Sequence, residues 1–265
     1  MSNALSRLVV TAVALPVVLG AVYLGGWWLF VLVALAAAVA LHEFWLLARP
    51  LSPLSPAGYV GGMLALVGAQ LGDAAWMIGG AMTALVLAFA LKGISAARQA
   101  ATASISATVM GAVWVGCGLA FTLLIRDLPE HGRLAAFAVL LSVWAGDTLA
   151  YAGGRLLGRH RMAPTTSPGK TWEGFFFGTV ATIFVAFVAL YEQGFVSIGE
   201  SIVLGAVIAV AAPLGDLFES MLKRDMQVKD TGRLLGGHGG MLDRIDAVLF
   251  AAPAAYFCIL AFGQA

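Results

Sequence analysis

The chain has 265 residues, of which 61% are hydrophobic and only 11% are charged. This composition excludes an ordinary soluble domain, in which about 25% of residues are charged, and is typical of integral membrane proteins. The formal net charge is only +1, but the charged residues are distributed unevenly, and their distribution is more informative than their sum.

Nine apolar runs are long enough to cross a membrane as helices, which takes about 17 to 25 residues each. They predict an all-α polytopic membrane protein with about nine transmembrane helices in a single domain, 1–265. We see no internal repeat and no linker that would define a second domain. The runs lie at about 8–24, 27–47, 55–72, 74–92, 104–125, 134–153, 172–191, 200–222 and 245–262.

The basic residues predict how these helices are oriented, because cytoplasmic loops carry an excess of Lys and Arg. With the amino terminus in the cytoplasm, 13 of the 15 Lys and Arg residues lie on the cytoplasmic side, leaving Arg126 and Arg133 outside. An odd number of spans then places the carboxyl terminus outside. We therefore expect a protein of the inner (cytoplasmic) cell membrane whose polar loops and active site face the cytoplasm.

His42 and Glu43 form the first polar pair, toward the cytoplasmic end of the second run. Long polar side chains near a helix end often reach toward the interface while their stems pack against apolar neighbours. We expect a packing or interfacial role for this pair, and a position beside a polar pocket stays open. The sequence does not predict a specific function for either residue.

A first polar cluster lies at 144–174. Asp147, Tyr151 and Arg155 are spaced to share one helical face at the cytoplasmic end of the sixth run. An ionised carboxylate inside an apolar segment is costly unless it has a partner, so Asp147 requires an explanation. We expect Asp147 and Tyr151 to contact substrate.

Ser167 and Pro168 predict where the seventh helix begins. Ser is a favoured N-cap, and Pro is favoured at the first helical position. Lys170 would then stand at the positive end of the helix dipole, a place suited to anions. We expect Ser167 and Lys170 to bind substrate.

The second polar cluster, Pro213–Asp246, holds 11 of the 29 charged residues in 34 positions. Such crowding in an apolar protein suggests a polyanionic ligand and metal ions. Asp216, Ser220 and Lys223 are spaced to share one helix face in the eighth run. The alternative for Asp216 is a structural ion pair with Lys223 or Arg244.

Asp243 and Asp246 are three residues apart at the start of the ninth run, so they face the same side. Together with Asp216 they would offer the oxygen ligands that Mg²⁺ prefers. The prediction is a Mg²⁺ site formed by these three carboxylates, and a second metal ion stays open. The alternative is a solvated helix end whose acids interact with the helix dipole.

A glycine-rich loop precedes this helix start, with Gly236, Gly237, Gly239 and Gly240 around His238. Glycines let the backbone approach a phosphate with its N–H groups pointing inward. The alternative is a tight turn without a ligand. Nearby basic residues suit a triphosphate, or else a belt that contacts anionic lipid head groups: Lys223, Arg224, Lys229 and Arg233.

Two blocks of the chain resemble the phosphatidate cytidylyltransferase (CDP-diacylglycerol synthase) family. The first is 158–174, GRHRMAPTTSPGKTWEG. The second block matches at Ser220, Lys223, Arg224, Lys229, Asp230, His238, Gly239, Gly240, Asp243, Arg244, Ile245 and Asp246. This second block departs from the family at one position. Gly236 stands where family members often have Pro before Gly-His-Gly-Gly, which alters the stiffness of that turn.

The resemblance implies a membrane enzyme that condenses CTP with phosphatidic acid to give CDP-diacylglycerol and pyrophosphate. A homodimer is an expectation from the family, and no nucleic acid partner is expected. The alternatives are a related CTP-dependent enzyme acting on another lipid phosphate, and an anion transporter, although no inverted repeat is evident. The residues predicted to be catalytic are Asp216, Asp243, Asp246, Lys223, Arg224, Lys229, Asp230 and His238. Those predicted to bind substrate are Asp147, Tyr151, Ser167, Lys170, Ser220, Gly239, Gly240 and Arg244.

Overall fold

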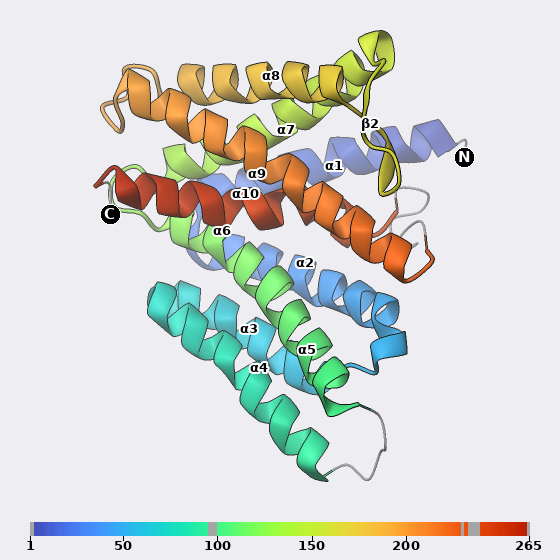
Figure 1. Ribbon diagram of the computed structural model, residues 1–265. Helices are drawn as coiled ribbons and strands as arrows, with labels where there is room; N and C mark the ends of the chain where they lie inside the picture. The colour runs from blue at the N-terminus through green and yellow to red at the C-terminus, as the bar shows by residue number, and fades with distance from the viewer. Residues whose placement is uncertain (1–2, 95–99, 229–230, 233–238, 264–265) are drawn as a thin grey trace. The chain divides into compact units, whose positions relative to one another are not determined.

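The computed structural model describes residues 3–94, 100–228, 231–232 and 239–263 of the chain (Figure 1). These residues are mostly helical, as predicted, and the one departure is a short antiparallel hairpin. They divide into two compact units, the first made of Met1–Leu124 with Met226–Ile245 and the second of Ile125–Asp225 with Asp246–Ala265. The single transmembrane domain stays a prediction.

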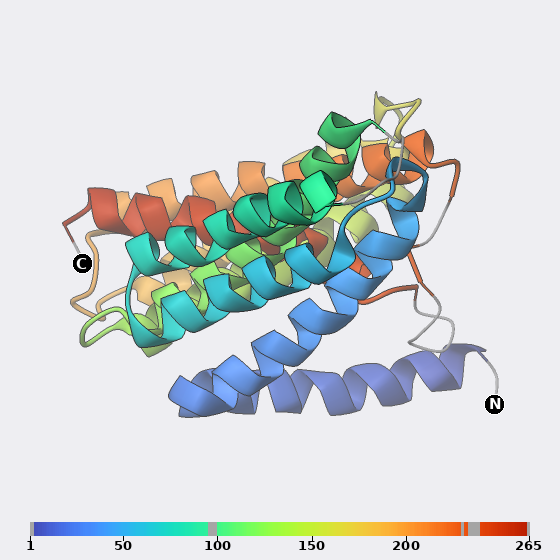
Figure 2. The ribbon, with the colours of Figure 1, turned by 90° about the horizontal axis from the view of Figure 1, so that it is seen from below.

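The first unit consists of long apolar helices and one interrupted helical rod. In the rod, α5 continues through a π-helical segment into α6, which reaches into the second unit. Helices α1 and α2 diverge from the turn at Gly25, whose φ is 67° (Figure 2). The elements are α1 (Asn3–Leu24), α2 (Gly26–Leu47), a 3₁₀ turn (Arg49–Leu51), α3 (Ser55–Leu71), α4 (Ala74–Ile94), α5 (Ala101–Gly111), the π segment (Ala112–Cys117) and α6 (Gly118–Arg126).

Glycines allow the helices of the first unit to pack closely around Trp45 of α2. A Cβ at Gly58 of α3 or at Gly111 of α5 would collide with the Trp45 indole ring. A Cβ at Gly116 would lie 2.7 Å from the Cα of Gly62. Small residues at helix crossings are typical of membrane helices, which associate through close packing. The carboxyl-terminal half of α2 is therefore held firmly, which matters for Glu43 below.

The second unit packs α7 against α8, joined by the hairpin, with α9 and α10 completing it. A Cβ at Gly178 would lie 2.9 Å from the Ala150 Cβ and from the Gly146 carbonyl oxygen. Gly146 and Ala150 on α7 are four apart, as are Gly178 and Thr182 on α8, a spacing that allows close helix contact. The elements are α7 (Gly132–Leu157), β1 (Arg161–Ala163), β2 (Ser167–Thr171), α8 (Trp172–Leu190), α9 (Ile198–Asp225) and α10 (Leu242–Ala261).

Every predicted apolar run falls on a helix or helical rod of the described chain, within a few residues. Seven of the described helices are long and apolar enough to cross a membrane, and α1 and α3 are not among these seven. Large apolar side chains such as Trp76 and Phe89 are 71% and 69% exposed, which suits a lipid-facing surface. The polytopic membrane class is thus supported, and the count of nine spans stays a prediction.

Candidate active site

The hairpin brings Lys170 of the second unit to Asp216, although 45 residues separate them in the chain. The Lys170 Nζ atom lies 2.9 Å from Asp216 Oδ2 and donates a hydrogen bond of 3.1 Å to the Pro213 carbonyl oxygen. Ser220, one turn further along α9, donates to Asp216 Oδ1 at 3.3 Å. The structure thus confirms that Asp216 and Ser220 share a helix face. The ion-pair partner of Asp216 is Lys170, whereas the sequence alternatives were Lys223 and Arg244.

The prediction that Ser167 caps the seventh helix is wrong. Ser167 begins β2, and α8 begins at Trp172 with Thr171 as its N-cap, whose Oγ1 accepts a 3.1 Å hydrogen bond from the Gly174 amide. The chain after α7 supplies β1 as a partner strand, and Trp172 N donates to the His160 carbonyl oxygen at 2.9 Å. Sequence signals for capping do not reveal such a partner strand. Lys170 therefore lies on a strand and not on the first turn of a helix.

The hairpin is fastened at both of its ends. Glu173 in the first turn of α8 accepts hydrogen bonds from the backbone amides of Arg159 and His160, at 3.1 and 3.2 Å to Oε2. Arg224 near the end of α9 donates from Nε to the Thr166 carbonyl oxygen at 3.2 Å. These contacts hold β2, and therefore Lys170, against α9. Arg224, a predicted phosphate contact, helps in this structure to position the hairpin.

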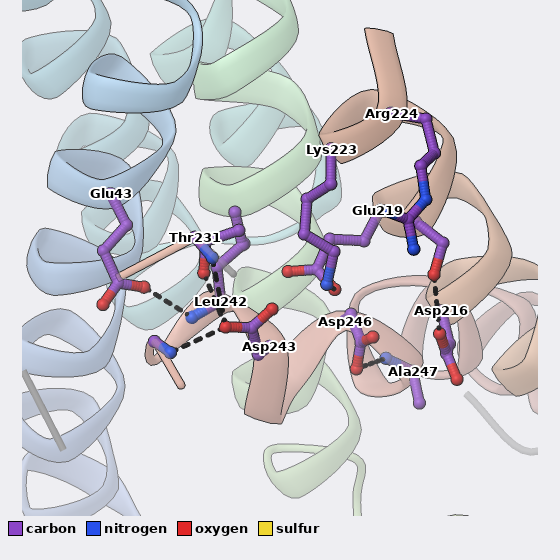
Figure 3. A network of polar contacts seen from close by, with 12 residues as sticks. Glu43, Asp216, Glu219, Lys223, Arg224, Thr231, Leu242, Asp243, Asp246 and Ala247 are labelled. Carbon is purple, nitrogen blue, oxygen red and sulfur yellow. Dashed lines mark hydrogen bonds and ion pairs between the residues drawn. The ribbon is translucent and has the colours of Figure 1, made fainter. Parts of the chain in front are cut away.

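Three carboxylates of the second unit interact electrostatically: Asp147 on α7, Asp216 on α9 and Asp246 on α10. Asp246 is only 9% exposed, and its Oδ1 accepts a 2.8 Å hydrogen bond from the Ala247 amide. Figure 3 shows Asp216 and Asp246 facing the same region from their two helices. A Cβ at Gly215 would collide with the Asp246 carbonyl oxygen, so α9 and α10 cross closely only because glycine stands there.

Glu219 and Lys223 form a second, more buried ion pair on α9. The Lys223 Nζ lies 2.8 Å from Glu219 Oε2, and the two side chains are 14% and 1% exposed. Glu219 also interacts with Asp246. Lys223 thus lies beside the acidic group through its ion pair with Glu219. Glu219 is close to the face of Asp216, Ser220 and Lys223 in the sequence but was not predicted as a site residue, and the structure adds it to this group.

In the first unit, Asp243 organises the chain just before and at the start of α10. Its Oδ2 accepts hydrogen bonds from Thr231 N at 3.3 Å, Thr231 Oγ1 at 2.9 Å and Gly240 N at 2.7 Å (Figure 3). Gly239 has φ 78°, which confirms that a glycine supplies a conformation that other residues avoid. The Gly240 amide, which was predicted to face a phosphate, donates to Asp243.

Glu43 reaches the same segment from α2, a role that sequence reasoning missed. Its Oε1 accepts from the Met241 amide at 3.0 Å and its Oε2 from the Leu242 amide at 2.8 Å (Figure 3). The side chain is 1% exposed. An acid within a long apolar run, followed directly by Phe44 and Trp45, is the signal in the sequence. His42, its neighbour, lies elsewhere, with Nδ1 3.3 Å from the Tyr59 hydroxyl group.

The remaining predicted residues divide into described and undescribed ones. Tyr151 is 68% exposed on α7, and its hydroxyl accepts a 2.9 Å hydrogen bond from Arg155 Nη1. Arg244 lies in the first turn of α10, and its amide donates to the Met241 carbonyl oxygen at 3.0 Å. Lys229, Asp230 and His238 lie outside the described residues, as do Arg233, Gly236 and Gly237.

Among the described residues, no three His, Cys, Asp or Glu side chains come together as a ready set of metal ligands. Asp147 and Asp216 nevertheless place negative charge next to the ammonium group of Lys170, and Asp246 interacts with both of these acids. Mg²⁺ in nucleotide sites commonly takes only one or two protein carboxylates, with substrate phosphates and water completing its shell. The acids of the second unit fit that pattern, and Lys170 would suit the phosphates.

The chain matches a known protein family over most of its length. The model of the "Cytidylyltransferase family" matches residues 5–262. A protein of Mycobacterium bovis named phosphatidate cytidylyltransferase is 41% identical over 159 residues, 58% of this chain and 50% of that one. A protein of the same name from Haemophilus influenzae is 41% identical over 130 residues, 47% of this chain and 45% of that one. Another from Staphylococcus haemolyticus is 40% identical over 146 residues, 55% of this chain and 55% of that one. The chain spans about half the length of these relatives.

Proposed function

This chain belongs to the cytidylyltransferase family, and from that premise we propose that it transfers a cytidylyl group from CTP to phosphatidic acid. The products would be CDP-diacylglycerol and pyrophosphate. The name shared by the relatives supports phosphatidate as the acceptor. The observation that carries the proposal is the contact of Lys170 with Asp216, because it joins the first block that resembles the family to α9, the helix on which the second block begins. A homodimer stays a prediction.

The proposed reaction forms one bond and breaks one. A phosphate oxygen of phosphatidic acid attacks the α-phosphorus of CTP, and the bond from that phosphorus to the oxygen bridging to the β-phosphate breaks, releasing pyrophosphate. The attacking phosphate monoester is already ionised near neutral pH, so no protein base is needed. The obstacle is repulsion between two anions, and catalysis consists mainly of positioning and charge stabilisation.

The described residues offer both signs of charge for this task. Lys170 on β2 and Arg224 on α9 are the cations we propose to contact the phosphates of CTP, since both lie on or against the hairpin. Asp147 would contact substrate from α7. Fixed charges of this kind stabilise a transition state because they need no reorganisation as the reaction proceeds.

We propose Mg²⁺ as the cofactor, held by Asp216 and Asp246 of the second unit, with Asp243 as a further ligand predicted from the sequence. The fit rests on the chemistry of the donors, because carboxylate oxygens are what this hard cation prefers. When bound, the metal would neutralise charge on the reacting phosphates. Ser220 and Lys170 each contact one oxygen of Asp216 and so orient this carboxylate.

We also propose that the protein lies in the inner cell membrane with the hairpin in the cytoplasm. The distribution of basic residues supports this orientation. Exposed tryptophans support a place in the membrane, since Trp27 and Trp28 lie in the first turn of α2 and Trp76 in the first turn of α4, where each helix would meet an interface. Tryptophan is enriched at membrane interfaces, where one side of the ring meets lipid and the other water.

The orientation predicts a difference between two exposed positions in the second unit. In a variant lacking Cys117 and Cys258, Thr165→Cys in the hairpin should resist an impermeant thiol reagent added to intact cells. Gln193→Cys, in the turn after α8, should react, because α8 separates the two positions. Both should react after the cells are opened. Labelling of Thr165→Cys in intact cells would contradict the orientation.

The proposed function itself is tested with the purified full-length chain, phosphatidic acid and CTP labelled at the α-phosphate. We expect label to enter a lipid product, with one pyrophosphate released per lipid labelled. Label entering only another lipid phosphate would instead support the related cytidylyltransferase. An absence of transfer in the presence of Mg²⁺ would contradict the proposal and favour the anion transporter.

A further inference from the structure

Glu43 is a buried acid in the last turns of α2. Its side chain is 1% exposed, and the neighbouring Phe44, Trp45 and Leu47 are buried as well. A carboxylate removed from water is strongly destabilising unless hydrogen bonds compensate it. Glu43 therefore has a defined task in the first unit, and its contacts identify that task.

The contacts show that Glu43 caps the start of α10 from a distance of 199 residues along the chain. Its two carboxylate oxygens accept one hydrogen bond each from Met241 N and Leu242 N. The first amides of a helix have no partner within the helix, and a negative charge there interacts favourably with the helix dipole. One side chain thus satisfies two such amides at once.

The surrounding chain is shaped to admit this carboxylate. A Cβ at Gly232 would collide with Glu43 Oε1, and a Cβ at Gly240 would collide with Glu43 Oε2 and with Thr231 Oγ1. Only residues without a side chain fit at both places. The Glu43 carboxylate therefore occupies a space bounded by Gly232 and by Gly240 of the glycine loop.

The orientation of Asp243 depends on the same part of the chain, around Thr231 and Gly240. The oxygen Oδ2 of Asp243 accepts from Thr231 N, Thr231 Oγ1 and Gly240 N, so these neighbours determine its orientation. Glu43 holds Met241 and Leu242, which join Gly240 to Asp243. If Glu43 loosened its hold, the aspartate and the backbone that orients it would shift together.

We propose that Glu43 is a positioning residue for the cytidylyl transfer, acting through the orientation of Asp243. This inference rests on the proposed function. Within the described residues, the Glu43 carboxylate accepts its hydrogen bonds from backbone amides, so we assign it no direct contact with the nucleotide. Replacing Glu43 should therefore lower kcat and speed hydrogen exchange of the nearby backbone amides, and it should change KM for CTP only weakly.

The test compares Glu43→Gln with wild type in the full-length protein. Gln keeps the shape but loses the charge and turns one acceptor into a donor that faces an N–H group. We expect kcat per folded molecule to fall about 10- to 100-fold, with KM for CTP changed by less than about 3-fold, because small misplacements of a catalytic group cost rates of this order. Glu43→Asp, which keeps the charge, should recover part of the loss.

A second readout does not depend on activity. Hydrogen exchange followed by mass spectrometry should show the amides of 239–245 exchanging at least about tenfold faster in Glu43→Gln, since hydrogen bonds to a charged acceptor are lost. Peptides from α3 and α4 should be unchanged. His42→Gln is the matched control, because His42 adjoins Glu43 on α2 but its side chain is exposed and lies by Tyr59; it should leave exchange and kcat unchanged.

Each outcome either supports or contradicts the proposed role of Glu43. Unchanged exchange in Glu43→Gln would overturn the capping role, and faster exchange with unchanged kcat would reduce Glu43 to a stabilising residue. A raised KM with unchanged kcat would indicate a substrate contact instead. If wild type transfers no label from CTP to phosphatidate, the proposed function fails, while the exchange experiment still tests the role of Glu43 in holding the segment.

Discussion

Asp216→Asn should abolish cytidylyl transfer while leaving the protein folded and in the membrane. Asn is nearly isosteric but neutral, so it can neither pair with Lys170 nor supply the charge that a Mg²⁺ ligand needs. The Asp216 side chain is 41% exposed, so the change does not open the core. We expect Asp243→Asn to abolish turnover as well. The double variant should be little worse than either single one, because residues acting as a unit are not additive.

The competing explanation is that Asp216 serves only to neutralise Lys170. If so, Asp216→Asn should lower the thermal stability of the protein, and adding Lys170→Met should restore that stability, because one charge is no longer left without its partner. We expect no restoration. Activity is measured against Mg²⁺ concentration, with Asp127→Asn as the control, since Asp127 is an exposed acid of the same unit that lies between α6 and α7. Near-normal activity of Asp216→Asn with an unchanged Mg²⁺ requirement would show that the proposed metal site is wrong.

Lys170→Ala should lower kcat/KM by roughly 100-fold or more, about 3 kcal/mol of transition-state stabilisation. The hairpin places the ammonium group beside Asp216, where it would meet the triphosphate. Lys170→Arg should recover only part of the activity, because the planar guanidinium group differs in shape from an ammonium group. Arg224→Ala should have an effect of similar size, partly because Arg224 also fastens the hairpin at Thr166.

Lys92→Ala is the matched control for Lys170→Ala. Lys92 lies in the last turn of α4 and belongs to the basic residues that we expect only to face the cytoplasm. Its replacement should leave kcat/KM unchanged. If Lys170→Ala behaved like Lys92→Ala, Lys170 would belong to a belt that contacts lipid head groups, the alternative that the sequence left open for the basic residues.

The helices themselves could be predicted from the sequence alone. Apolar runs of membrane-spanning length are a local property, and each of them falls on an observed helix or rod. Contacts within one helix were also predictable, because residues four apart necessarily share a face. Asp216 and Ser220 confirm this at 3.3 Å, and Arg155 with Tyr151 shows the same spacing on α7.

The contacts between elements were decided only by the tertiary structure. Lys170 meets Asp216 because a short strand pairs where a helix start was predicted, and the partner strand β1 cannot be recognised from the capping signals of Ser167 and Pro168. Glu43 meets Met241 and Leu242 across 199 residues because glycines leave space for its carboxylate. A uniformly apolar helix has no residue pattern that shows which neighbouring helix it contacts. The sequence by itself therefore determined only which chemical groups lie along each helix and in what order. Helix packing, governed by close contacts at small residues, decided which of those groups meet.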